Sequence, residues 1–253
     1  MTTGTARWRR SRLIKRQPDS GGRPRSALRR AAVVAAGLVV ALAIAGAVYL
    51  QSLPGVGDAQ MRTRQIMASH REGDAMPAPP RLVDAAVSVE DEHFYDNVAV
   101  NVMSGMGRAL VAALQGGGDT GGSTIDQQLA KQIYGGSTVR DIGLGVKLAL
   151  TYSPAQIIAM YLNVAYYGHG YWGVAQAARG YFGATPTRLT WGEAAMLGGL
   201  LQAPSTYDPL AHPALARARE HHVLSQLVVN HYLGARTATA ALAAPLIPPR
   251  ARA

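Results

Sequence analysis

Residues 122–129 read Gly-Ser-Thr-Ile-Asp-Gln-Gln-Leu, and this stretch decides the fold class that the sequence predicts. The hydroxyl of Ser123 can cap the start of a helix by accepting a backbone N–H. Ile125, Leu129 and Ile133 then recur at helical spacing and form one apolar stripe. We therefore expect a helix that begins just after Ser123 and packs this stripe into a core.

A second polar block, Glu90-Asp91-Glu92-His93-Phe94, lies about thirty residues earlier and follows the apolar residues 87–89. On spacing alone, such a run of acids is more often a solvated set of charges that complements a helix dipole. Here a carboxylate pair leads into an aromatic, and a Gly-Ser-Thr turn with two glutamines follows. The two blocks together suggest a polar active-site cleft.

The sequence predicts two further helix starts, at residues 153–156 and 190–193. Each pairs a Ser or Thr cap with Gln or Glu three positions later, which is the capping-box pattern. Apolar residues then repeat at helical spacing: Ile157, Ile158, Tyr161 and Leu162 after the first, and Met196, Leu197, Leu200 and Leu201 after the second. No convincing alternating strand run appears, so the predicted class is mainly α.

The N-terminal 50 residues predict a membrane anchor. Residues 1–30 hold ten Lys or Arg and one Asp, whereas residues 31–50 carry no charge and are long enough to cross a bilayer as a helix. The arginines predict that the N-terminus stays cytoplasmic and that the chain crosses the membrane once, so that the residues after 50 face the periplasm or the outer leaflet. A cleaved signal peptide is the alternative, because Ala45-Gly46-Ala47 resembles a cleavage site.

The 253 residues have room for one compact domain plus an appendage. We expect a basic tail (1–30), a transmembrane helix (31–50), a juxtamembrane connector (51–74), the main domain (75–227) and a C-terminal extension (228–253). Without the tail the charge is close to neutral, which argues against a nucleic-acid partner. The absence of cysteine excludes disulfides and thiolate metal sites.

The order and spacing of the two polar blocks resemble glycosyltransferase family 51, the peptidoglycan glycosyltransferases that polymerise lipid II. Matches to the first motif are Glu90, Asp91 and Phe94, and matches to the second are Gly121, Ser123, Thr124, Ile125, Gln127, Gln128, Leu129 and Lys131. Four positions differ from the family pattern. Asn97 stands in place of a histidine, Ala99 in place of a glycine, Asp126 in place of a hydroxyl residue and Gln132 in place of an asparagine.

The later motifs are altered more strongly. Asp141 falls on the glutamate of the third motif, and Ser137 and Thr138 replace its two cations. Arg140 can partly substitute for them, or it forms only a local surface ion pair with Asp141. The fourth motif ends in Asn163 as expected but has Pro154 in place of lysine, and Arg219 in the fifth is interpreted as structural.

Residues 98–114 form an apolar segment with a single charge. They are interpreted either as a core helix or, by the resemblance, as part of a mobile and partly membrane-embedded lobe. Residues 116–122 lack a phosphate-loop ending and read as flexible chain. The histidines 221, 222 and 231 lack one-face metal spacing and read as surface residues.

The resemblance implies a lysozyme-like fold and an inverting transfer of a lipid-linked glycan onto lipid II, with Glu90 as general base and Asp141 as second carboxylate. The substrate-binding residues it implies are Asp91, Phe94, Ser123, Thr124, Gln127, Gln128, Lys131, Arg140 and Asn163. No tightly bound cofactor is expected, with Mg²⁺ or Mn²⁺ as the candidate divalent ion. The expected partners are lipid II, lipid-linked glycan, the membrane and other cell-wall synthesis proteins. The resemblance also implies a location in the bacterial inner membrane, with the main domain in the periplasm.

Two other functions stay open at this point. The lost cations and the added acid Asp126 suit a binding or scaffold protein that keeps the fold without turnover. Glycan cleavage is the third hypothesis, because lysozyme-like folds can hydrolyse glycans with acidic residues.

Overall fold

The computed structural model describes residues 25–73, 77–96 and 123–247, with side chains from residue 28 onward. The chain forms two compact units, Met1–Val48 and Tyr49–Ala253. The described residues contain helices and no β-strand, with one isolated bridge between Tyr166 and Trp172. The prediction of a mainly α protein is confirmed.

The first unit contains most of α1 (Arg25–Ser52). Its segment Leu28–Ser52 is long and apolar enough to cross a membrane, with a mean hydropathy of 2.6 and no charge beyond Arg29 and Arg30. The helix starts earlier and ends later than the predicted 31–50, because the flanking residues also favour helix.

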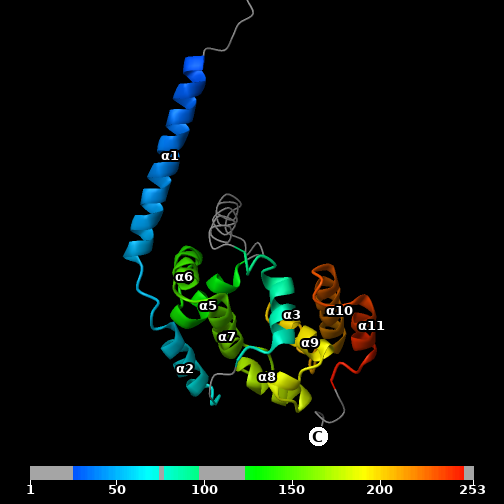
Figure 1. Ribbon diagram of the computed structural model, residues 1–253. Helices are drawn as coiled ribbons and strands as arrows, with labels where there is room; N and C mark the ends of the chain where they lie inside the picture. The colour runs from blue at the N-terminus through cyan, green and yellow to red at the C-terminus, as the bar shows by residue number, and fades with distance from the viewer. Residues whose placement is uncertain (1–24, 74–76, 97–122, 248–253) are drawn as a thin grey trace, which may run out of the picture. The chain divides into compact units, whose positions relative to one another are not determined.

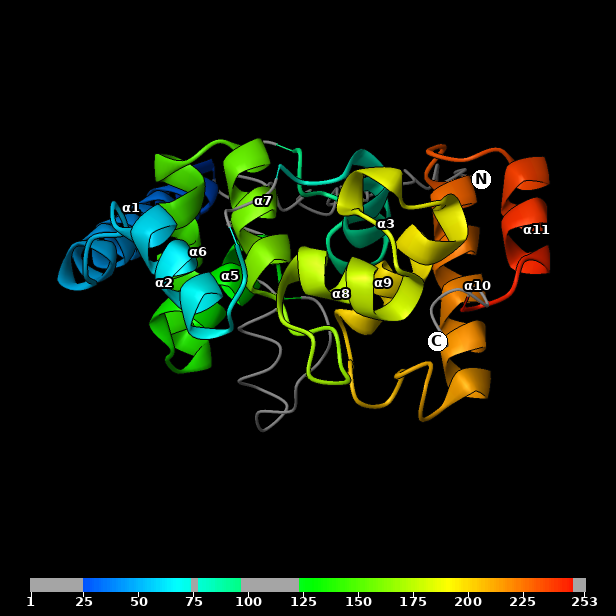
Figure 2. The same ribbon diagram turned by 90° about the horizontal axis from the view of Figure 1, so that it is seen from below.

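The described part of the second unit is built from helices (Figure 1). They are α2 (Ala59–Ser69), α3 (Pro80–Glu90), α5 (Ile125–Tyr134), α6 (Thr138–Thr151), α7 (Pro154–Val164), α8 (Gly173–Phe182), η1 (Pro186–Arg188), α9 (Trp191–Leu200), α10 (Pro213–Val229) and α11 (Ala235–Ala243). Both views place α2, α5, α6 and α7 on one side of α3, and α10 and α11 on the other (Figures 1 and 2).

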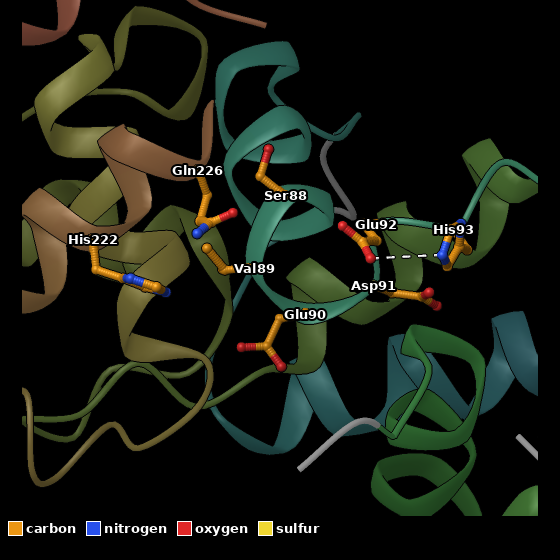
Figure 3. Close-up of a pocket in the computed structure, with 8 residues that line it drawn as sticks. All are labelled: Ser88, Val89, Glu90, Asp91, Glu92, His93, His222 and Gln226. Carbon is orange, nitrogen blue, oxygen red and sulfur yellow. Dashed lines mark ion pairs between the residues drawn. The ribbon is translucent and has the colours of Figure 1, made fainter. Parts of the chain in front are cut away.

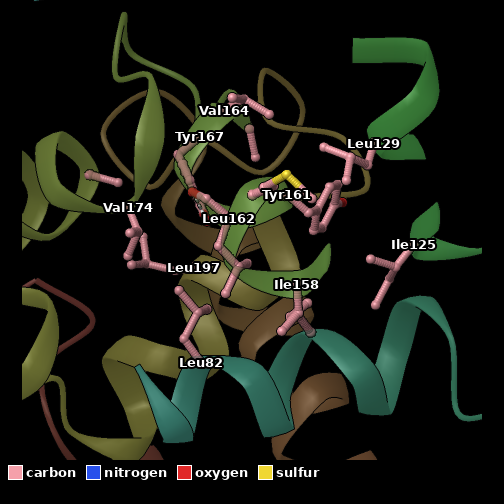
Figure 4. Close-up of a cluster of buried hydrophobic side chains, with 14 of the residues drawn as sticks. Leu82, Ile125, Leu129, Ile158, Tyr161, Leu162, Val164, Tyr167, Val174 and Leu197 are labelled. Carbon is pink, nitrogen blue, oxygen red and sulfur yellow. Dashed lines mark hydrogen bonds between the residues drawn. The ribbon is translucent and has the colours of Figure 1, made fainter. Parts of the chain in front are cut away.

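A large hydrophobic cluster holds α3, α5 and α7 together (Figure 4). Leu82 of α3, Ile125 of α5 and Ile158 of α7 are at most 1% exposed in this cluster. A second cluster joins α3 and α9 to α10 and α11. Helix α3 takes part in both clusters, so its C-terminal end, which carries Glu90, is fixed from two sides.

Helix α5 begins one residue later than the Ser123 cap predicts. Thr124 is the N-cap: its hydroxyl accepts from the backbone N–H of Gln127, and the Gln127 side chain accepts from the N–H of Thr124. Ser123 lies outside the cap and is exposed. The expected stripe Ile125, Leu129 and Ile133 is buried, and the capping boxes of α7 and α9 form as predicted.

Two segments outside the predicted main domain are also structured. The expected connector contains α2, which buries Ala59, Thr63 and Met67. The expected C-terminal extension contains α11, which packs against α9 and α10. Residues 98–114 and 116–122, for which a core helix or lobe and a flexible loop were predicted, lie outside the described residues.

Candidate active site

Glu90, the last residue of α3, is the centre of the site. Its side chain is 9% exposed, and its Oε2 accepts a hydrogen bond of 2.9 Å from the side-chain amide of Gln128 on α5. The hydroxyl of Tyr161 on α7 donates to the other end of that amide at 2.8 Å. Three helices therefore meet at the Glu90 carboxylate, and Gln128 has a fixed orientation.

Asp91 connects the first polar block to the second. Its Oδ2 accepts from the backbone N–H of Ile125 at 3.2 Å, which is the first N–H of α5. Helix N-terminal amides lack intrahelical partners and attract anions, so this contact stabilises the α5 start. Asp91 holds the two motifs in register; a contact with substrate stays a prediction.

A cavity of about 280 Å³ lies next to Glu90 (Figure 3). Its lining comes from the end of α3, the following turn and α10, namely Ser88, Val89, Glu90, Asp91, Glu92, His93, His222 and Gln226. In the turn, the His93 ring lies 3.6 Å from Glu92 and 2.7 Å from Asp96. The cavity is polar and is large enough for part of a sugar ring system.

Burial sets the proton affinity of Glu90. Burial raises the pKa of its carboxyl, and the neighbouring Asp91 charge raises it further, whereas the Gln128 hydrogen bond and the Arg219 charge lower it. A carboxylate with a raised pKa is a better base than one in water. The direction of the shift suits proton transfer from a hydroxyl.

Asp126 is a buried acid in the first turn of α5. It is 5% exposed, and burial together with the charge of Asp91 raises its pKa to about 7. A buried carboxyl close to another acid favours its neutral form. This residue therefore carries a proton over part of the physiological range.

Asp141 lies in the first turn of α6, and it is 6% exposed. Burial raises the pKa of its carboxyl, and the charges of Lys131 and Arg140 oppose that rise. Its Oδ1 is buried without a hydrogen-bond partner among the described residues. Arg140 donates to the carbonyl of Gly135 at 3.2 Å while its charge acts on the Asp141 carboxyl, so both interpretations of Arg140 stay predictions.

Several predicted substrate-binding residues have structural contacts. Phe94 lies in the large hydrophobic cluster, 3% exposed. Thr124 and Gln127 form the α5 cap described above. Asn163 is 3% exposed and donates to the carbonyl of Ala159 at 2.7 Å. Ser123 is exposed, and its carbonyl accepts from Gln128 at 3.3 Å.

Two residues of the site were missed by the sequence predictions. Tyr161 was assigned only to an apolar stripe, although it orients Gln128 through its hydroxyl. Arg219 of α10 was interpreted as structural, yet its Nη2 lies 3.9 Å from Oε1 of Glu90. Tyr161 lies in the stretch that matches the fourth motif, and Arg219 lies in the stretch that matches the fifth. These matches were the sequence evidence that could have indicated a place in the site.

The described residues contain no group of three His, Asp or Glu side chains arranged for a metal ion. Mg²⁺ is commonly held by one or two carboxylates together with substrate phosphates. Asp141, with its unpartnered Oδ1, fits such a partial site, and Lys131 and Arg140 lie near enough to act on its charge.

Fold and site together define a helical domain with a buried carboxylate at a polar cavity. Comparison with known families gives a match of residues 60–228 to the transglycosylase family. The chain belongs to this family, which is the glycosyltransferase family 51 that the motifs resemble.

Relatives of this chain are penicillin-binding proteins. It is 38% identical to penicillin-binding protein 2a of Streptococcus pneumoniae over 60% of this chain and 21% of that protein. It is 37% identical to penicillin-binding protein 1A of Haemophilus influenzae over 67% of this chain and 20% of that protein. The chain therefore spans about a fifth of the length of these relatives. The crystal structure of the Haemophilus protein matches 49% of this chain and 16% of that chain at 32% identity, with a TM-score of 0.35.

Proposed function

We propose that this protein polymerises lipid II into glycan strands. The observation that carries the proposal is the buried Glu90 carboxylate, which lines a polar cavity and is oriented by Gln128. Membership of the transglycosylase family supports a glycosyl transfer in general; the substrate and the direction of the reaction are our inference.

In this mechanism Glu90 accepts the proton of the lipid II 4-hydroxyl at Oε2, the oxygen to which Gln128 donates. The acceptor oxygen attacks the anomeric carbon of the lipid-linked glycan, a new C–O bond forms, and the bond to the lipid diphosphate breaks. Attack from the face opposite the leaving group inverts the anomeric centre. The buried carboxylate, with its raised pKa, accepts the proton more readily than an exposed one.

The departing diphosphate requires positive charge. Lys131 and Arg140 are the cations that act on the Asp141 carboxylate, and we assign the leaving group to this region. Asp141 would hold a divalent ion together with the diphosphate oxygens, an ion that would supply charge neutralisation to the leaving group. The apolar helix α1 would keep the domain at the membrane that contains both lipid substrates, with the basic tail in the cytoplasm.

A second candidate is a family member that binds lipid II without turning it over. It is favoured by Ser137 and Thr138, which stand at the N-terminus of α6 where the family pattern has two cations, and by the buried acid Asp126. Such a protein would act as a scaffold among cell-wall synthesis proteins.

The test is polymerisation of labelled lipid II by the detergent-purified full-length protein, with Mg²⁺, with Mn²⁺ and with EDTA. Binding of lipid II is measured in parallel by fluorescence anisotropy. Glycan strands on a gel are expected under our proposal. Binding without strands in every buffer would favour the scaffold, and soluble muropeptides released from sacculi would favour glycan cleavage.

A further inference from the structure

The two oxygens of the Glu90 carboxylate have different surroundings. Oε2 accepts from Gln128, whereas Oε1 is buried and accepts no hydrogen bond within the described part of the chain. The nearest cation is Nη2 of Arg219, at 3.9 Å, and this atom is also buried without a hydrogen-bond partner there. Their side chains are only 9% and 11% exposed.

Arg219 is held in place by contacts on its own side of the site. Its Nε donates to the carbonyl of Gly199 at 3.3 Å, and its guanidinium carbon lies 5.6 Å from the centre of the Tyr207 ring. Gly199 leaves the necessary space, because a Cβ at that position would come within 2.7 Å of the Arg219 Cγ. Glu90 is therefore not needed to fix the arginine.

The distance of 3.9 Å between Nη2 of Arg219 and Oε1 of Glu90 affects the strength of the base. A bidentate arginine would engage both carboxylate oxygens and greatly weaken the base. A buried carboxylate without any nearby cation would favour the protonated form, which cannot accept a proton. At 3.9 Å the Arg219 charge attracts Oε1 without a hydrogen bond, and Oε2 keeps its hydrogen bond from Gln128 without an arginine bond to weaken it as a base.

We propose that Arg219 is a positioning residue for Glu90: it draws Oε1 to the α10 side and keeps Oε2 turned toward Gln128 as the atom that receives the acceptor proton. This inference rests on the proposed role of Glu90 as base. Arg219 itself touches no reacting atom in this account, and its effect passes through the carboxylate.

Other groups also act on Glu90 and must be held constant in a test. The groups around it are Asp91, which follows it in the chain, Gln128 of α5, Tyr161 of α7, and Arg219 and His222 of α10. Burial, Arg219 and His221 lower the pKa of His222, so this ring is mostly neutral above pH 7. Arg219 is thus the cation that a substitution can remove selectively.

The experiment compares the full-length protein with Arg219→Gln and Arg219→Lys. Selective ¹³C labelling of glutamate side chains gives few carboxyl signals, because the chain has glutamate only at positions 72, 90, 92, 193 and 220. The Glu90 signal is identified by its loss in Glu90→Gln. Its titration is followed by NMR in detergent micelles, and the pH profile of polymerisation is measured on the same samples.

We expect Arg219→Gln to shift both the Glu90 titration and the acidic limb of the activity profile upward by about one pH unit, and Arg219→Lys to shift them less. Arg217→Gln is the matched control, because Arg217 bonds Glu220 and the carbonyls of Leu242 and Ala244. It should lower thermal stability and leave the Glu90 titration in place.

An unmoved Glu90 titration in both Arg219 variants would overturn the inference and leave Arg219 a structural residue. If Arg219→Gln fails to fold, Arg219→Met replaces it as the uncharged variant and is judged by the same criterion, because Arg219→Lys keeps the charge. A shifted titration in a protein that makes no glycan strands would support the positioning role and overturn the proposed function, so the two failures are distinguishable.

Discussion

The side-chain amide of Gln128 donates a hydrogen bond of 2.9 Å to Oε2 of Glu90 across 38 positions of sequence. This bond lowers the pKa of the Glu90 carboxyl, in opposition to the effect of burial. It also fixes which carboxylate oxygen faces the helix α5. The bond therefore joins the two polar sequence blocks, residues 90–94 and 122–129, in one site.

Gln128→Met should therefore reduce the polymerisation rate by about tenfold, since an oriented base contributes roughly 10²–10⁴ to a rate and orientation is only partly lost. The acidic limb of the pH profile should move upward, because the pKa-lowering bond is gone. Steady-state kinetics between pH 5 and pH 9 checks both effects. Tyr161→Phe removes only the hydrogen bond from Tyr161 to the Gln128 amide and should move the acidic limb less than Gln128→Met does. An equal shift in both variants would contradict this expectation.

Asp126→Asn should change how stability depends on pH. The folded-state pKa of about 7 lies above the ordinary value of 3.8, so the native state binds this proton more tightly than the unfolded state. The stabilisation is present below about pH 3.8 and is lost as the pH rises through about 7. The variant should exceed the wild type in free energy of unfolding above pH 7 and match it more closely near pH 4.

Denaturant unfolding at a series of pH values measures this difference. Asp58→Asn is a control of opposite sign, because hydrogen bonds from Tyr134 and Arg62 lower the pKa of Asp58. That variant should be less stable than the wild type at neutral pH. An Asp126→Asn curve parallel to the wild-type curve would show that the acid is ionised without cost.

Asp141→Asn should slow polymerisation by about a hundredfold if the carboxylate holds a divalent ion at the diphosphate. The loss of a group that stabilises charge in the transition state typically costs roughly 10²–10³ in rate. The requirement for Mg²⁺ or Mn²⁺ should weaken together with the rate. Titration of each ion into the assay measures this. A variant with normal rate and normal metal response would remove Asp141 from the mechanism.

Lys147→Met should loosen the end of α1 from α6. The Lys147 ammonium donates to the carbonyls of Leu50 at 3.2 Å and Leu53 at 2.9 Å, in the last turn of α1 and just after it. Bonds from a charged donor contribute about 1.5–3 kcal/mol each at most. Thermal unfolding and limited proteolysis near residues 53–57 should both show the loss, whereas Arg64→Met at an exposed position of α2 should show neither.

Much of the fold was predictable, because it depends on local rules. Capping boxes at Ser153 and Thr190 and the apolar stripes behind them predicted α7 and α9 correctly. The α5 cap was misplaced by one residue, since Ser123 and Thr124 have equivalent hydroxyls and only the backbone decides between them. Helix α2 was not anticipated, because its apolar face is short and becomes buried only through tertiary packing.

The site was predictable in part. The motif match identified Glu90 and Gln128, and the structure brings them into contact. The motif match could not reveal the long-range pair of Arg219 and Glu90, because positions 129 apart meet only after α10 packs on α3. Nor could it show that Asp126 is buried, since the same position on a helix can face solvent or the core.

The most direct test of the central claim compares Glu90→Gln with the wild type in the lipid II polymerisation assay. Glu193→Gln is the matched control, because glutamine serves the capping box of α9 as well as glutamate does. We expect glycan strands from the wild type and from Glu193→Gln, and none from Glu90→Gln although this variant folds and binds lipid II. Strand synthesis at the wild-type rate by Glu90→Gln would contradict the assignment of Glu90 as the base.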